Sequence, residues 1–380
     1  MNCYYTESEW RKLPMKFICD RDTFAKEIAI AQDIIASKNA FSIMSNVYLE
    51  VMDSKLFIRA TDAKVGFETE IPISDAEPGS LTVFCDKLLA ITNSIPEGDM
   101  RFEQHESSIE IRPLSKKVRF QLKTIAGDKF PEIPRIGESH YFALQAHDLR
   151  KMISQTIFSV SNDETRFFMN GVFMEKLPDG ELAMIATDGR RLAFISTQEA
   201  DIPDFQSAII PPKVLSVILK RASDEGQILM AVNEKNVFFR FGNYQLTSYL
   251  IEGKFPNYQK VIPKDQHFKF IVARDELQAA LRRVSLFVEK SNKVIFNVSS
   301  KGLVLESEET ELGAAREELS CEYEGDDVVI LLSLRYLEDP LKAMDSDNLA
   351  IEFSDPSRAI TLRPEPDSSY FHIIMPMQQP

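Results

Sequence analysis

The sequence is poor in the residues that build metal, disulfide and nucleophile sites. Its four cysteines, Cys3, Cys19, Cys85 and Cys321, have no paired spacing, and its five histidines form no HExxH or Cys/His set. Because metal sites need clustered ligands, we expect reduced thiols, unligated imidazoles and no metal. The sequence also contains no P-loop, no G-x-S-x-G elbow and no zinc spacing, so it predicts no cofactor and no enzyme.

Long apolar runs are missing as well. No stretch of about 18 apolar residues and no basic leader with an apolar core occurs, so we expect neither export nor membrane insertion, and a cytoplasmic protein. At 380 residues and 44% apolar content, the chain is too long for one core and too apolar for general disorder.

The chain contains a threefold repeat. Phe17, Phe142 and Phe270 each begin a short apolar strand followed by a charged turn and an amphipathic helix. The apolar positions expected on one face of these helices are Phe24, Ile28, Ala31 and Ile35, then Leu149, Ile153, Thr156 and Val160, then Leu277, Leu281, Val284 and Val288. We therefore expect an extension at 1–14 and three domains at 15–135, 136–264 and 265–380.

The copies continue to match beyond the first helix. Two strands lead to Thr61-Asp62 in the first copy and to Thr187-Asp188 in the second, whereas the third has only Glu309-Thr310 there. A second helix begins near Lys87, Lys213 and Arg335, and three strands follow it. The sequence thus predicts an α+β fold, with two helices and about eight antiparallel strands per repeat and the helices packed on one side of the sheets.

The charge is unevenly distributed. The chain carries −14 in total, but the six expected helix windows carry a net +5, so the remainder carries −19. Helices in contact lie about 8–10 Å apart, so six of them close a circle too narrow for a duplex, whereas twelve leave a bore of roughly 25–28 Å. A head-to-tail dimer is therefore the smallest ring that could thread DNA, held by local positive charge despite the acidic total.

Three motifs on this repeat resemble the bacterial sliding clamp family, the beta subunit of DNA polymerase III. They are Ala186 to Ala193 (ATDGRRLA), Gly253 to Tyr258 (GKFPNY) with Val261 and Pro263, and Ile373 to Met377 (IIMPM). The resemblance covers essentially Met15 to Met377. It implies the DNA clamp fold in a ring-forming dimer that slides on duplex DNA, is loaded by an ATP-driven complex, tethers the polymerase and has no catalytic activity.

The resemblance also implies a pocket between the second and third domains for short peptides of the polymerase alpha subunit, the clamp loader, other polymerases and repair proteins. Carried over residue by residue, its members are Met169, Thr187, Gly189, Arg190, Arg191, Leu192, Pro256, Lys260, Val261, Ile373, Ile374, Met375, Pro376 and Met377. Adaptable thioethers suit varied apolar anchors. This sequence departs from well-known members at Ser291, where an aromatic is common, and in its Gln378-Gln379-Pro380 ending.

Two further surfaces follow from the resemblance. The residues expected near DNA, without reading its sequence, are Lys38, Arg166, Phe167 and Phe168, with weaker candidates on the helices at Arg150, Lys151, Lys213, Lys220, Arg221, Arg282, Arg283 and Lys342. The expected dimer seam joins Lys117, Arg119, Phe120 and Leu122 of one chain to Leu286 and the acidic run Glu306, Glu308, Glu309, Glu311, Glu317 and Glu318 of the other. Opposite charge there sets orientation more than affinity.

Two other classes of function remain open from the residues alone. One is an enzyme that uses Asp62 and Asp188, although both follow threonine at turn positions in different repeats. The other is a peptide-binding scaffold that works independently of DNA.

Overall fold

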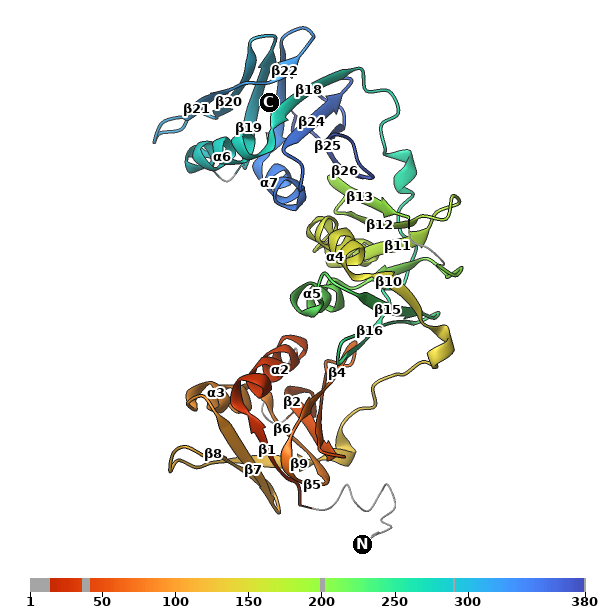
Figure 1. Ribbon diagram of the computed structural model, residues 1–380. Helices are drawn as coiled ribbons and strands as arrows, with labels where there is room; N and C mark the ends of the chain where they lie inside the picture. The colour runs from red at the N-terminus through yellow and green to blue at the C-terminus, as the bar shows by residue number, and fades with distance from the viewer. Residues whose placement is uncertain (1–13, 36–41, 199–201, 290, 379–380) are drawn as a thin grey trace. The chain divides into compact units, whose positions relative to one another are not determined.

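A computed structural model describes residues 14–35, 42–198, 202–289 and 291–378. Within these ranges, each repeat has the predicted order of elements (Figure 1). The first contains β1 (Lys16–Asp20), α2 (Arg21–Ile34), β2 (Asn46–Met52), β3 (Lys55–Thr61), β4 (Val65–Pro72), β5 (Ser74–Glu77), β6 (Gly79–Phe84), α3 (Cys85–Ser94), β7 (Asp99–His105), β8 (Ser108–Pro113) and β9 (Phe120–Ala126).

The other two repeats follow the same plan. The second contains β10 (Phe142–Gln145), α4 (Ala146–Ser154), β11 (Val172–Lys176), β12 (Leu182–Thr187), β13 (Arg191–Thr197), β14 (Ala208–Ile210), α5 (Pro212–Arg221), β15 (Gln227–Val232), β16 (Asn236–Phe241) and β17 (Tyr244–Tyr249). The third contains β18 (Phe268–Ala273), α6 (Arg274–Val284), β19 (Lys293–Ser299), β20 (Gly302–Ser307), β21 (Arg316–Leu319), β22 (Glu322–Tyr323), β23 (Val328–Ser333), α7 (Leu334–Ala343), β24 (Asn348–Phe353), β25 (Ile360–Glu365) and β26 (Tyr370–Ile374).

The first helix of each repeat is shorter than the sequence pattern predicted. The last expected apolar positions, Ile35, Val160 and Val288, all lie beyond the helix ends. In the second repeat, α4 ends at Ser154, and the Thr156 hydroxyl donates to the Met152 carbonyl at 2.7 Å. A hydroxyl that bonds back to the preceding turn competes with helix continuation, and the 3-10 turn η4 (Ile157–Ser159) follows.

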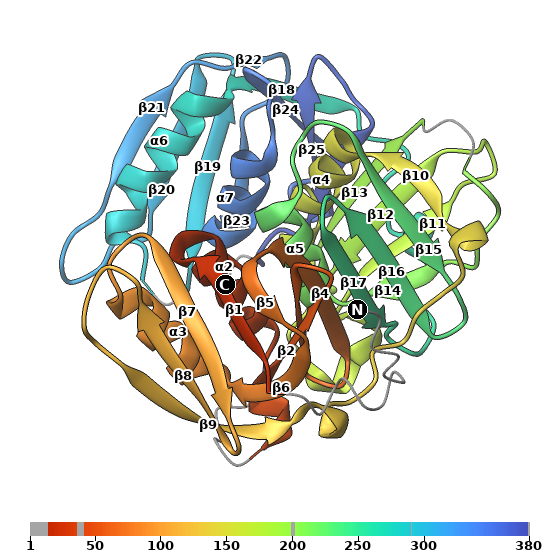
Figure 2. The same cartoon turned by 60° about the horizontal axis from the view of Figure 1, so that its bottom comes forward.

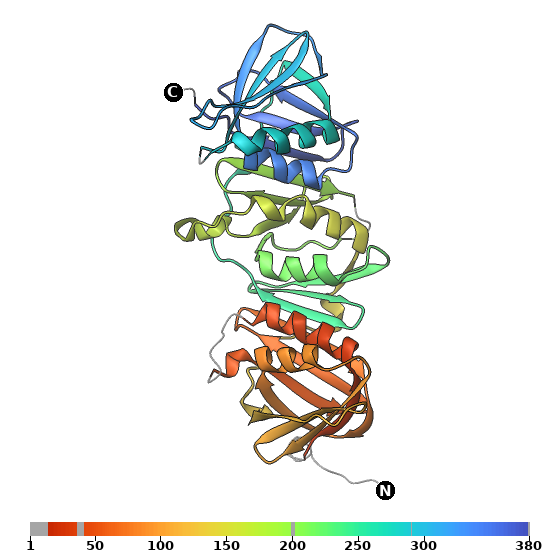
Figure 3. The same ribbon diagram turned by 90° about the vertical axis from the view of Figure 1, so that its left-hand side faces the viewer.

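The chain forms two compact units, one of residues 1–144 with 216–250 and one of residues 145–215 with 251–380. In the first unit, α2 and α3 pack side by side (Figure 1). Phe24 of α2 packs on Phe102 of β7. In the second, α6 and α7 pack side by side, and α6 contacts β20 and β21 (Figure 3). The paired helices thus cover one face of the strands of their own repeat.

Successive repeats are joined by strand pairing within these units. In the first unit, β17 pairs antiparallel with β4, with Thr247 opposite Gly66. In the second, β26 pairs antiparallel with β13, with Ile373 opposite Leu192. The four-stranded sheet of the third repeat has the order β21-β20-β19-β23, so β21 is an edge strand (Figure 2). Among the described residues, no helix has the length and apolar character needed to cross a membrane.

Candidate functional site

The second junction brings most residues of the candidate peptide pocket together. β13 and β26 place Leu192 beside Ile373, and the Met375 amide donates to the Arg190 carbonyl at 2.9 Å. Leu192 and Ile373 are buried in one cluster with Phe255 and Tyr258. The turn before β13, the tail after β26 and the loop around Phe255 therefore meet at one place.

The loop from Phe255 to Val261 is fixed by aromatic packing. Phe255 stacks on Phe173 of β11 with ring centroids 4.7 Å apart. The Tyr258 hydroxyl donates to Glu175 Oε1 at 2.7 Å, and burial, with this carboxylate as the next cause, raises the pKa of Tyr258. The loop then turns through η6 (Tyr258–Lys260) and presents Val261, which is 56% exposed.

The candidate residues divide into a floor and a rim. The buried residues are Met169, Thr187, Arg191, Leu192, Ile373 and Ile374. The half-buried or exposed residues are Gly189, Arg190, Pro256, Lys260, Val261, Met375, Pro376 and Met377. Met375 is 46% exposed, and the Met377 amide donates to the Leu331 carbonyl at 2.8 Å, which anchors the tail. The arrangement offers adaptable apolar side chains over a fixed apolar floor.

The two Thr-Asp pairs have the same structural role. Asp188 Oδ1 accepts the amides of Arg190 and Arg191, at 2.9 and 3.1 Å. Asp62 Oδ1 accepts the amides of Lys64 and Val65, at 2.9 and 2.7 Å. Each carboxylate closes its own turn, so neither is placed as a general acid or base. In the described part of the chain, no three His, Cys, Asp or Glu side chains are grouped to hold a metal.

Arg191 lies beneath the pocket. Its side chain is 1% exposed and makes ion pairs with Asp188 at 3.1 Å and with Asp339 of α7 at 2.7 Å. Its guanidinium also donates to the Phe158 carbonyl at 2.5 Å and lies over the Tyr336 ring, 4.9 Å from the centroid. The sequence motif located Arg191 but not its burial, and it missed Asp339 and Tyr336, although Tyr336 stands in the repeated helix start.

A buried histidine lies beside this arginine. His372 is 0% exposed, packs on Phe158 with ring centroids 5.6 Å apart, and neither ring nitrogen has a hydrogen-bond partner among the described residues. Burial, and secondarily the charge of Arg191, holds the pKa of His372 well below its ordinary value. The imidazole is therefore neutral and acts as part of the core.

The first junction has the same strand pairing but different residues at the matching position. Gly66 stands opposite Thr247 where Leu192 stands opposite Ile373. A β-carbon on Gly66 would stand 2.5 Å from Ile133 Cγ2, and the Thr247 hydroxyl donates to the Pro134 carbonyl at 3.2 Å. At the first junction, Ile133 thus occupies the place that corresponds to the Leu192 side chain of the second junction.

The candidate DNA residues lie on one short segment, except for Lys38, which is outside the described residues. Arg166, Phe167 and Phe168 belong to the 3-10 segment η5 (Glu164–Met169), where Phe167 is 50% exposed. Phe168 packs against the cluster of Leu192 and Phe255. Several weaker candidates are paired with carboxylates within the chain, namely Lys151 with Asp345, Lys220 with Asp33, Arg283 with Glu317 and Lys342 with Glu338.

The candidate seam residues are exposed on both units. On the first, Lys117 and Arg119 are exposed and Phe120 and Leu122 are half-buried. On the second, Leu286 in η7 (Ser285–Phe287) is 80% exposed. The acidic side chains near β21 include Glu306 and Glu318, both paired with Arg316, and Glu317, paired with Arg283.

Comparison with known proteins finds the same family along nearly the whole chain. The DNA polymerase III beta subunit family matches in three parts, with its N-terminal domain at 15–134, its central domain at 143–257 and its C-terminal domain at 259–378. A "Beta sliding clamp" of Treponema pallidum is 42% identical over 370 residues, covering 96% of this chain and 100% of that protein.

Solved structures of the same family have a similar fold. Sliding clamps (DNA polymerase III subunit beta) from Pseudomonas aeruginosa and Bartonella birtlesii, each bound to griselimycin, are 25% and 26% identical to this chain. Both have a TM-score of 0.89 and cover 97% of this chain and 100% of their own.

Proposed function

This chain belongs to the DNA polymerase III beta subunit family of sliding clamps, and we propose that two copies join head to tail into a ring around duplex DNA. The ring works without catalysis or a cofactor, in the cytoplasm, and contacts DNA without reading its sequence. Its pocket holds short peptides of the polymerase III alpha subunit, the clamp loader, other polymerases and repair proteins.

The main evidence for the ring is that two strands, β9 and β21, pair with no strand of another repeat among the described residues. At the two internal junctions, β17 pairs with β4 and β26 pairs with β13. In the first repeat, β9 corresponds to β17 and β26, and in the third repeat, β21 corresponds to β4 and β13. β9 pairs with β8 and β6, and β21 pairs with β20. Within the described ranges, neither strand has the cross-repeat partner of its counterparts. A second copy supplies both partners if β9 pairs with β21 across the seam.

The internal junctions also predict the register of that pairing. In the β8–β9 pair Ile109 stands opposite Leu122, and at the matching place in the β16–β17 pair Val237 stands opposite Ser248. Lys117 precedes Leu122 by as many residues as Asn243 precedes Ser248, so Lys117 corresponds to Asn243. In the β20–β21 pair Leu303 stands opposite Leu319, and at the matching place in the β3–β4 pair Leu56 stands opposite Ile71. Glu318 and Glu70 each precede these last residues by one position, so Glu318 corresponds to Glu70.

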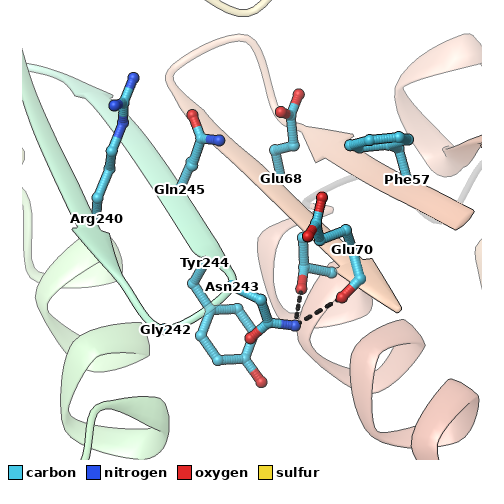
Figure 4. A pocket seen from close by; sticks show the side chains of 9 residues that line it. Phe57, Glu68, Glu70, Arg240, Gly242, Asn243, Tyr244 and Gln245 are labelled. Atoms are coloured by element: carbon cyan, nitrogen blue, oxygen red, sulfur yellow. Dashed lines mark hydrogen bonds between the residues drawn. The ribbon is translucent and has the colours of Figure 1, made fainter. Parts of the chain in front are cut away.

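At the first junction, the side-chain Nδ2 of Asn243 donates to the Thr69 hydroxyl at 2.9 Å and to the Glu70 backbone carbonyl at 2.8 Å, as Figure 4 shows. The matching seam position sets Lys117 opposite the partner's Glu318 and Phe120 opposite the small Ala315. Arg119 then faces Arg316, whose charge Glu306 and Glu318 already balance. The seam is therefore complementary in charge at Lys117 and in size at Phe120.

Topology gives the decisive test of the ring. The clamp is placed on a nicked circular plasmid by its loader and ATP, and its retention is measured by gel filtration before and after the plasmid is cut. We expect retention on the circle and release from the linear form, because a ring slides off free ends. Equal retention on both forms would indicate local binding, and no retention on either would favour the DNA-independent scaffold.

The pocket is tested through the exposed Met375 and the half-buried Met377. We expect Met375→Ala with Met377→Ala to weaken capture of a polymerase-derived peptide at least tenfold by calorimetry, because both thioethers are removed from the rim. The dimer should persist, since neither residue lies at the seam. Lys269→Ala, on the exposed side of β18, is the matched control and should bind as the unaltered chain does. Unchanged affinity in the methionine variant would exclude this pocket.

A further inference from the structure

η5, which carries the candidate DNA residues, lies directly against the candidate peptide pocket. A β-carbon on Gly189 would stand 2.8 Å from Arg166 Nη1. A β-carbon on Gly253 would stand 3.3 Å from Phe168 Cβ and 3.4 Å from Phe167 Cε2. Gly189 and Gly253 have φ of +88° and +107°, and because they have no side chain, η5 can approach them closely.

The same segment ends at Met169, a buried member of the candidate pocket. Met169, its last residue, is 5% exposed, and its carbonyl accepts the Ser161 amide at 2.9 Å. Phe168 packs on the buried cluster below the pocket. A displacement of η5 therefore moves groups that shape the peptide site.

An ion pair positions Arg166 at this boundary. Asp163 accepts Arg166 Nε at 2.9 Å, and it also accepts the Thr165 hydroxyl at 2.6 Å and the Thr165 amide at 2.9 Å. The hydroxyl of Thr165 and the guanidinium of Arg166 are the two largest causes that lower the pKa of Asp163 to about 2, so this carboxylate is charged at neutral pH. The Arg166 side chain is 45% exposed, which leaves it within reach of a phosphate.

From these contacts we propose that DNA contact and peptide capture oppose each other through η5, an inference that rests on the function proposed above. A phosphate bound to Arg166 competes with Asp163 and draws the guanidinium away from Gly189. η5 then loosens from the turn that shapes the pocket, and the peptide binds more weakly. Linkage requires that a bound peptide weaken DNA contact by the same factor, so a partner-loaded ring slides more freely.

The test measures peptide affinity at increasing concentrations of DNA. A dye-labelled hexapeptide with two large apolar side chains is titrated by fluorescence anisotropy at low salt, alone and with a short linear duplex. We expect the duplex to raise the peptide Kd about fivefold and then to have no further effect once it saturates. A Kd that keeps rising in proportion to duplex would mean that DNA occupies the pocket itself, which overturns the proposal.

Two variants assign the coupling to Arg166. In Arg166→Ala, the duplex should change the peptide Kd by less than about twofold. In Arg358→Ala, which removes an exposed arginine from the turn after β24, the fivefold effect should remain. An effect that persists in Arg166→Ala, or is absent from the unaltered chain while both ligands bind, contradicts the coupling alone. Failure of the unaltered chain to bind either ligand contradicts the proposed function itself.

Discussion

At the scale of single residues, Arg191 shows how one side chain can shape a site that it does not face. Its guanidinium is buried between Asp188, Asp339 and the Phe158 carbonyl. We therefore expect Arg191 to act on a peptide through the positions of Leu192 and the turn before it. Its neighbour Arg190 is exposed and can contact a ligand directly.

Arg191→Ala should lower the stability of the second unit by about 2–4 kcal/mol, because it leaves two carboxylates without their buried counter-charge. For a unit of this size, such a loss lowers the midpoint of thermal unfolding by roughly 5–12 °C in scanning calorimetry. Arg190→Ala, one residue away and exposed, should shift the midpoint by no more than about 2 °C. Equal shifts in the two variants would show that the buried contacts of Arg191 contribute little.

At the scale of secondary structure, the repeat pattern predicted the elements well. All six helices lie where the spacing of Phe17, Phe142 and Phe270 expected them, and the antiparallel α+β clamp fold is confirmed. Helix ends were less predictable. Val160 and Val288 continue the apolar period in sequence, but α4 and α6 end before reaching them and pass into the 3-10 turns η4 and η7.

The three motifs that predicted the pocket lie together at the second junction, and its role in binding peptides stays a prediction. No pattern in the sequence shows why the matching positions of the two junctions differ. The difference depends on Gly66, whose missing side chain lets Ile133 from a distant loop fill the space. Such a contact between segments 67 residues apart in sequence follows from the fold and not from local spacing. The roles of the site residues stay predictions, as do the domain boundaries.

At the scale of the whole molecule, the remaining question is how two chains find one register. Two strands from separate chains can pair in several registers when nothing specifies one, and a shift by one residue turns every side chain to the other face. Two charges supply that specification: Lys117 is exposed three residues before β9, and Glu318 is exposed on β21. The register taken from the internal junctions sets these two residues opposite each other.

We therefore expect Glu318→Lys to weaken the dimer about tenfold in sedimentation velocity, because like charges then stand directly opposite. Lys117→Glu should do the same. Combining both changes should restore the dimer to within about threefold, since the pair is re-formed with its signs exchanged. Glu324→Lys, an equally exposed change next to β22, should have no effect. If the double variant is as weak as either single one, these residues do not face each other and the seam adopts another register.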